Sequence, residues 1–326
     1  ALVISLGSEP GGAVDPSVVY NTVSGEYLVV WAALEGMDGH EIFGQRLDAD
    51  GDPVGVDDFQ ISEMGVVGNS YRALNPRVAH NSLHNEYLVV WWGSDDQGGL
   101  VEGEYEIFGQ RLDASGFEIG VDDFVISDAG DIGDPAYAAV YPDVAYNPDR
   151  DEYLVVWSGE DNVGGLVQDE LEVFGQRLDA TGREVGINDS RISEAGGTGS
   201  PAYSVYGSRV HYDSDRQEYL VVWSGEDDRG ALLQCEFEIF GQRLDGDGVE
   251  LGADDRRLSF MGGTGNCDYG AYFPASAGEV IVWEGSDDAE LSVGEAEIFG
   301  IRRPEAPMFA DDFESGDTLG WSLTSP

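Results

Sequence analysis

The chain has 326 residues, of which 64 are acidic and 16 basic, and its formal net charge at pH 7 is −48. A surface this acidic repels nucleic acid and anionic lipid and attracts dissolved cations. No apolar run approaches the roughly 20 residues of a membrane-spanning helix, so we expect neither a nucleic-acid partner nor insertion into a membrane.

The chain consists of repeated copies of one sequence segment. The clearest marker of each copy is the tryptophan that ends a run of the type "EYLVVW". A fixed period of this length indicates a repeat architecture, in which the copies share one core. These tryptophans recur every 60 or 66 residues, at Trp31, Trp91, Trp157, Trp223 and Trp283.

The second copy shows the expected strands most clearly. Its β-branched and aromatic runs cover residues 76–80, 86–91, 106–112 and 122–127, and turns rich in Asn, Asp, Gly and Pro separate them. No run of comparable length has the 3.6-residue period of a helix. The segment "YLVVW" is apolar on both faces, which predicts a strand covered on both sides by neighbouring sheets. The sequence therefore predicts an all-β fold, a five-bladed β-propeller with four antiparallel strands in each blade.

The two ends of the chain complete each other. The last copy has three strand-like runs but no fourth run after Arg303, and "LVISLG" from Leu2 matches the fourth run of the second copy, "FVISDAG" from Phe124. We expect the N-terminal strand to complete the last blade and close the ring, which removes an exposed sheet edge. The propeller would span residues 1–304, and residues 305–326 would form a C-terminal docking or assembly tail.

On these motifs the chain resembles the secreted bacterial β-propeller repeat proteins that carry "EYLVVW" followed by text like "FGQRLDADG". The resemblance covers about Leu2 to Arg303 and implies the propeller fold. It leaves the function open, because propellers host lectins, glycosidases and scaffolds alike.

A glutamate recurs directly before the third strand of every copy, as in "EIFGQRLDADG" from Glu41. In copies two to five it closes a loop that also opens with acidic residues. Two carboxylates about 4 Å apart repel by roughly 1 kcal/mol in water and more in a protein, so their convergence predicts a bound cation, and Ca²⁺ suits flexible loops rich in oxygen ligands. A solvated acidic face and adaptation to high salt are the alternatives. The candidate ligands, one ion per copy, are Asp95, Asp96 and Glu106; Glu160, Asp161 and Glu172; Glu226, Asp227 and Glu238; and Asp287, Asp288 and Glu297.

Two further pairings of side chains are expected. An arginine of the third strand, such as Arg46, is expected to pair with acids of the fourth strand, such as Asp57 and Asp58. Cys235 and Cys267 fall on the same rim in adjacent copies, which predicts a disulfide and an oxidising compartment, with two free thiols as the alternative.

A tyrosine recurs in the loop before the first strand of copies two to five. Beside carboxylates, such rings could form a sugar-binding platform. The favoured alternative is that each ring fills the gap between two blades. The residues are Tyr71, Tyr137, Tyr203 and Tyr269.

No catalytic residue is predicted. The four histidines show no metal-ligand spacing, and no Ser or Cys lies in a nucleophile motif. Glycosidases use pairs of carboxylates, but among 64 acids some pair is always available, and no acid stands out from the repeats.

The first functional hypothesis is therefore a secreted, calcium-stabilised, non-enzymatic subunit of the cell surface or extracellular matrix. We expect it to associate with itself, and to form filaments, through the apolar tail residues Phe309, Phe313 and Trp321. The alternatives are a carbohydrate-binding lectin and a glycoside hydrolase that acts at the mouth of the central channel.

Overall fold

The computed structural model of the chain describes residues 4, 12–35, 39–64, 71–95, 98–228, 232–263, 265–286 and 296–302. These residues form strands joined by turns and loops, and none of them forms a helix that could cross a membrane. The expected tail, with Phe309, Phe313 and Trp321, lies outside the described residues.

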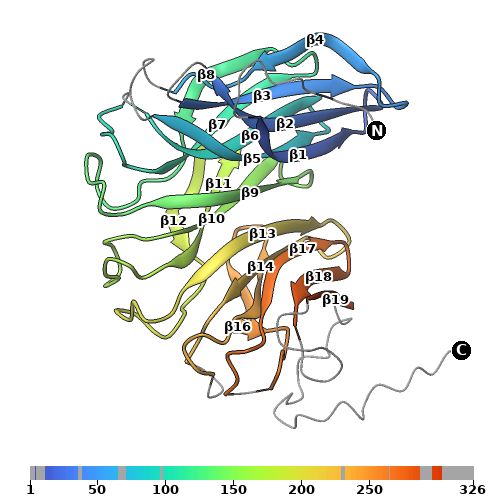
Figure 1. Ribbon diagram of the computed structural model, residues 1–326. Coiled ribbons are helices and arrows are strands. Elements are labelled where there is room, and N and C mark those ends of the chain that lie inside the picture. The colour runs from blue at the N-terminus through green and yellow to red at the C-terminus, as the bar shows by residue number, and fades with distance from the viewer. Residues whose placement is uncertain are drawn as a thin grey trace, which may run out of the picture.

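The strands form five antiparallel sheets, which are the five blades (Figure 1). In chain order the strands are β1 (Ala13–Asn21), β2 (Glu26–Glu35), β3 (Gly39–Leu47) and β4 (Pro53–Gln60) in blade one; β5 (Arg72–Asn81), β6 (Glu86–Ser94), β7 (Glu106–Asp113) and β8 (Glu118–Val125) in blade two; β9 (Ala139–Asn147), β10 (Glu152–Gly159), β11 (Glu172–Asp179) and β12 (Glu184–Arg191) in blade three; β13 (Val205–Asp213), β14 (Glu218–Gly225), β15 (Glu238–Asp245) and β16 (Glu250–Arg257) in blade four; and β17 (Ala271–Ala277), β18 (Val280–Gly285) and β19 (Glu297–Arg302) in blade five.

The order within each sheet confirms the predicted five-bladed β-propeller. Every strand pairs with the next one along the chain, so each blade is a simple meander. The strand expected to complete blade five falls on residues 2–7, which lie outside the described residues except for Ile4. The Ile4 side chain packs against a cluster of blade one that includes Val29 and Trp31.

The first strand of each blade is its innermost strand. β1, β5, β9, β13 and β17 contact one another in turn, as Figure 1 shows from the blue to the orange end of the chain. Near its start each of them has a break in register against the second strand. The residue at this bulge has a positive φ in every blade: Asp15, Asn75, Tyr141, Gly207 and Phe273.

In blades one to four the second strand is covered on both faces, as its apolar sequence predicts, whereas in β18 of blade five Val280 is 50% exposed. In β2, Leu28 and Val30 belong to a cluster shared with blade two, whereas Val29 and Trp31 belong to a separate cluster. All four side chains are less than 10% exposed. The core of the molecule is thus a series of layers between neighbouring blades.

The predicted disulfide is confirmed. Cys235 lies in the loop from β14 to β15, Cys267 lies in the loop from β16 to β17, and their Cα atoms are 5.4 Å apart. The bond therefore ties blade four to the loop that enters blade five.

We expect the double substitution Cys235→Ser and Cys267→Ser to lower the free energy of unfolding by about 3 to 4 kcal/mol, because the bridge restrains the unfolded chain. Denaturant unfolding in non-reducing buffer measures the loss. Reductant should lower the stability of the wild-type protein by the same amount and leave the variant unchanged. Equal midpoints for the two proteins in non-reducing buffer would contradict this account.

Candidate functional site

The recurring glutamate is buried and hydrogen-bonded within its own blade. Glu106 accepts a hydrogen bond from Ser127 Oγ and another, at 3.0 Å, from the backbone N–H of Ala129. The same pattern holds for Glu41, Glu172 and Glu238, and none of the four is more than 7% exposed. This carboxyl group therefore joins the start of the third strand to the chain that leaves the fourth.

Burial changes the protonation of these carboxyl groups. It raises the pKa of Glu106 to about 8, and likewise that of Glu172, although the hydrogen bonds from serine and backbone oppose the shift. The pKa of Glu238 is also raised by burial, while Arg257, whose guanidinium is 2.5 Å away, opposes it. At neutral pH the folded chain thus holds protons at Glu106 and Glu172 that the unfolded chain releases.

A second set of buried glutamates was missed from the sequence. Glu104 accepts hydrogen bonds of 2.8 Å from the N–H groups of Val101, in its own loop, and of Gly133, in the loop that enters the next blade. Glu170 and Glu236 make the equivalent bonds in blades three and four. The signal was present in the sequence, because each of these acids stands two residues before the recurring glutamate.

The carboxylates that were predicted to bind calcium accept hydrogen bonds mainly from backbone N–H groups. Glu160 accepts from the N–H of Asp169 at 2.9 Å, Glu226 accepts from that of Cys235, and Asp161 accepts from that of Asn162 at 2.6 Å. Among the described residues, no three acidic, His or Cys side chains come together in a way that could hold a metal ion. Asp96, Asp287 and Asp288 lie outside those residues, and calcium binding stays a prediction. The other proposed ligands that the structure places are the buried Asp95 and Asp227 and the exposed Glu297.

The four recurring tyrosines lie at the blade interfaces. Each packs against an apolar cluster between two blades. The rings of Tyr137, Tyr203 and Tyr269 also lie directly over loop glycines, at Gly130, Gly196 and Gly262. The geometry is that of space-filling side chains, the alternative that the sequence analysis favoured.

The recurring arginine forms a structural ion pair, but with a different carboxylate from the one expected. Arg46 lies 2.6 Å from Glu26 on the second strand, because Arg46 faces Leu28 across the ladder and Glu26 is the diagonal neighbour on the same face. The fourth-strand acid instead reaches the preceding blade, where Asp123 accepts the N–H of Glu63 at 2.7 Å. The equivalent ion pairs are Arg111–Glu86, Arg177–Glu152 and Arg243–Glu218.

The copies differ at the start of the innermost strands, where the central channel opens. The bulge position carries Asp15 in blade one and Asn75 in blade two, and the amide Nδ2 of Asn75 donates to Asp15 Oδ2 at 2.6 Å. Asp15 is exposed, and it is the single acid among the five bulge residues. An exposed carboxylate is thus held in place at the channel mouth by a neighbouring blade.

Two residues deeper, the innermost strand of blade three carries Asp143. Its carboxylate lies 3.9 Å from Arg77 Nε of blade two and accepts the N–H of Val210 in blade four at 2.9 Å. Burial raises the pKa of Asp143, and the charges of Arg209 and Arg77 oppose the rise. The residues at this level are Ser17, Arg77, Asp143, Arg209 and Ala275, so one carboxylate lies between guanidinium groups of its two neighbouring blades.

Aromatic rings surround this opening. Tyr141, Tyr206 and Tyr272 are each about 40% exposed, and Phe273 is 72% exposed. In blade two, Trp92 lies 6.0 Å from the Tyr141 ring. The guanidinium of Arg72 lies 5.6 Å from the Trp92 ring and 5.0 Å from that of Tyr105, within the range of cation–π contacts.

The sequence analysis missed Asp15, Asp143 and Trp92 because it looked for features that recur. Asp15, Asp143 and Trp92 occupy positions at which the other copies carry a different residue. The usable signal was therefore a difference between copies at a strand position that faces the channel.

No family model matches the sequence, and no curated protein matches it. Solved structures resemble it in fold. An N-acetylgalactosamine deacetylase from F. plautii is 15% identical, with a TM-score of 0.48, over 84% of this chain and 79% of that one. An endo-arabinase from Bacteroides thetaiotaomicron is 12% identical (TM-score 0.47, over 88% of this chain and 93% of that one), and an exo-β-1,3-galactanase from Clostridium thermocellum is 10% identical (TM-score 0.49, over 89% and 59%).

These comparisons correct the expected function. The sequence analysis predicted a non-enzymatic structural or assembly subunit, whereas the solved structures that the chain resembles are enzymes by name. That prediction was wrong because the repeats record what the blades share, which is the scaffold, and say little about the channel, where the copies differ.

The raised pKa values predict how stability depends on pH. Between about pH 4.5 and 8 the folded chain binds more protons at Glu106 and Glu172 than the unfolded chain does, so stability falls as the pH rises, by about 1.4 kcal/mol per pH unit for each group. In the double variant Glu106→Gln and Glu172→Gln we expect a smaller loss of stability between pH 5 and pH 8. Urea unfolding at a series of pH values measures the slope.

The matched control is Glu297→Gln, which changes the exposed equivalent in blade five and should leave the slope as in the wild type. A double variant with the wild-type slope would show that these two groups release their protons in the folded chain as they do in the unfolded one.

Proposed function

We propose that the chain is a secreted glycoside hydrolase that binds a sugar chain at the channel mouth and cleaves it with Asp15 and Asp143. The observation that carries the proposal is the pair of unlike carboxylates on the innermost strands of blades one and three. At both levels of the channel the equivalent residues of the other blades are not acidic. The pair therefore departs from the symmetry of the repeats, as a dedicated site requires.

The two environments suit the two roles in glycoside cleavage. One acid must keep its proton in order to donate it to the leaving oxygen, and one carboxylate must act as base or nucleophile. Burial raises the pKa of Asp143, which favours the protonated acid. Asp15 is exposed to substrate and is oriented by the Asn75 amide, which suits the base.

Arg77 links the two carboxylates. It lies beside Asp143 and also interacts electrostatically with Asp15. Burial lowers the pKa of Arg77, and Arg209 adds to the effect, while Asp143 and Asp15 oppose it. Its guanidinium has donors for both acids or for a sugar hydroxyl.

The surroundings favour a neutral sugar as substrate. The exposed rings of Tyr141, Tyr206 and Tyr272 offer apolar faces for the C–H groups of a pyranose or furanose. The net charge of −48 disfavours polyanionic substrates. The disulfide supports a secreted location, since such bonds persist in oxidising compartments.

A lectin is the second candidate, because the same exposed rings would also serve binding without turnover. The lectin and the hydrolase differ in whether they need the two acids. A lectin needs the rings and tolerates amides at both acidic positions, whereas a hydrolase does not.

We expect Asp15→Asn and Asp143→Asn each to lower kcat for polysaccharide cleavage by roughly 10²-fold to 10⁴-fold, the usual contribution of general acid–base catalysis. Release of reducing ends from a panel of neutral polysaccharides measures it, and thermal unfolding checks that each variant is folded. The control is Asp50→Asn, which changes an exposed acid in the turn between β3 and β4 and should retain full turnover.

Wild-type turnover in both folded channel variants would overturn these roles. Saturable binding of oligosaccharides by the wild type with no turnover, retained in both variants, would favour the lectin.

A further inference from the structure

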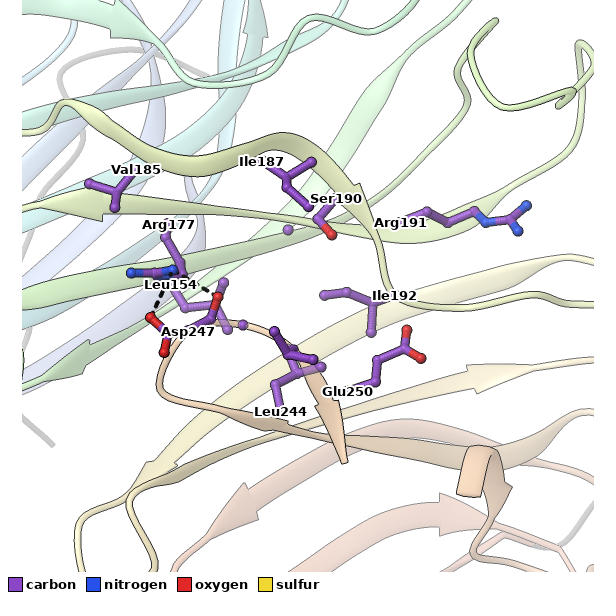
Figure 2. A pocket seen from close by; sticks show the side chains of 13 residues that line it. Leu154, Arg177, Val185, Ile187, Ser190, Arg191, Ile192, Leu244, Asp247 and Glu250 are labelled. Carbon is purple, nitrogen blue, oxygen red and sulfur yellow. Dashed lines mark hydrogen bonds and ion pairs between the residues drawn. The ribbon is translucent and has the colours of Figure 1, made fainter. Parts of the chain in front are cut away.

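A cavity of about 290 Å³ lies between blades three and four (Figure 2). It is open to solvent on one side, where Ile187 and Val249 of its walls are 77% and 60% exposed. Its walls are mainly aliphatic: Leu154, Ile187 and Ile192 come from blade three, and Leu244 and Val249 come from blade four. Arg177, Arg191, Asp247 and Glu250 provide its charged groups.

The cavity exists because one copy of the repeat lacks a ring. In blade one, Phe59 faces Gly44 across the ladder, and its ring lies over Gly116 of blade two, where an added Cβ would be 2.7 Å from the ring atom Cζ. In blade two, Phe124 faces Gly109 and its ring lies in the same way over Gly182 of blade three. A phenyl group thus fills the gap at each of these two interfaces.

Blade three has serine at this position. Ser190 faces Gly175 across the ladder, and Gly248 of blade four meets the methylenes of Arg177 instead of a ring. Ser190 and Gly248 both line the cavity. In blade four the equivalent residue is Arg256. The space that a phenyl ring occupies at two interfaces is therefore open between blades three and four.

We propose that this cavity binds a monocyclic aromatic compound, whose ring takes the place that Phe59 and Phe124 fill at the other interfaces. An apolar protein cavity of about 150 Å³ is known to hold benzene, so a volume of about 290 Å³ leaves room for a ring with a small substituent. The aliphatic walls match a flat apolar ring and lack the aromatic platform that a sugar would use.

The polar groups favour a ring that carries a hydroxyl. Ser190 is half-buried, and Arg191 and Glu250 belong to the opposite walls. Burial raises the pKa of Glu250, with Asp254 adding to the effect and the Arg191 charge opposing it. Phenol and benzyl alcohol are therefore the probes of choice. The site is separate from the channel and does not depend on the proposed hydrolase activity.

The test is a titration of the full chain with phenol and with benzyl alcohol, followed by NMR and by a crystal structure of the complex. We expect saturable binding at millimolar or lower concentration, with the ring between Ser190 and Gly248. Ser190→Phe restores the ring of the neighbouring interfaces and should weaken binding at least tenfold without lowering the melting temperature. Ser190→Leu, a smaller filling residue, should also weaken it and serves if the first variant does not fold.

A reciprocal variant sharpens the test. Phe124→Ser removes the ring between blades two and three, and we expect it to open a second, equivalent site for the same probes. The proposal is overturned if the wild type shows no saturable binding of phenol or benzyl alcohol, or if Ser190→Phe binds these probes as well as the wild type does.

Discussion

The buried glutamate at the start of the third strand in blades one to four is the constraint on which the blade geometry depends. A carboxyl group removed from water must find hydrogen-bond donors, and here they come from a serine at the end of the fourth strand and from the backbone just beyond it, as with Glu106, Ser127 and Ala129. That requirement fixes where the chain leaves one blade. Glu104 then fixes the loop that enters the next blade. Together these bonds hold the loops from which the innermost strands of blades three, four and five start, and so contribute to the shape of the channel mouth.

Much of the fold could be predicted from the sequence, because its signals are local and repeated. Apolar residues on both faces of the second strand predict that neighbouring sheets cover it on both sides. The regular spacing of the tryptophans indicates a repeat architecture. The partner of Arg46 could not be predicted in the same way, because the fourth-strand acids Asp57 and Asp58 are nearer to it in the sequence than Glu26 is. Only the register of the ladder, with Leu28 opposite Arg46, makes Glu26 the diagonal neighbour. The disulfide was predictable because two cysteines leave one pairing.

The candidate site was hard to predict for a physical reason. Packing between blades accepts only a narrow range of volumes, so the interface positions repeat from copy to copy. The channel mouth and the outer gap between blades are partly open to water, and side chains there can differ without a loss of packing. Asp143 is one of 64 acids in the sequence, and only its place on an innermost strand, beside Arg77 and below the exposed rings, distinguishes it from an acid of the surface.

The use of arginine strengthens the distinction between the channel and the rest of the surface. The recurring arginines are held in ion pairs that also reach the next blade, as when Arg177 bonds Glu152 and donates to the carbonyl of Asp247. Arg77 and Arg209 stand instead on innermost strands, on either side of Asp143. In a chain of net charge −48, the charges of Arg77 and Arg209 beside the half-buried Asp143 make the channel electrostatically unlike the acidic surface. A neutral ligand can therefore meet the guanidinium donors of Arg77 and Arg209 in the channel, whereas the surrounding surface offers mainly acceptors.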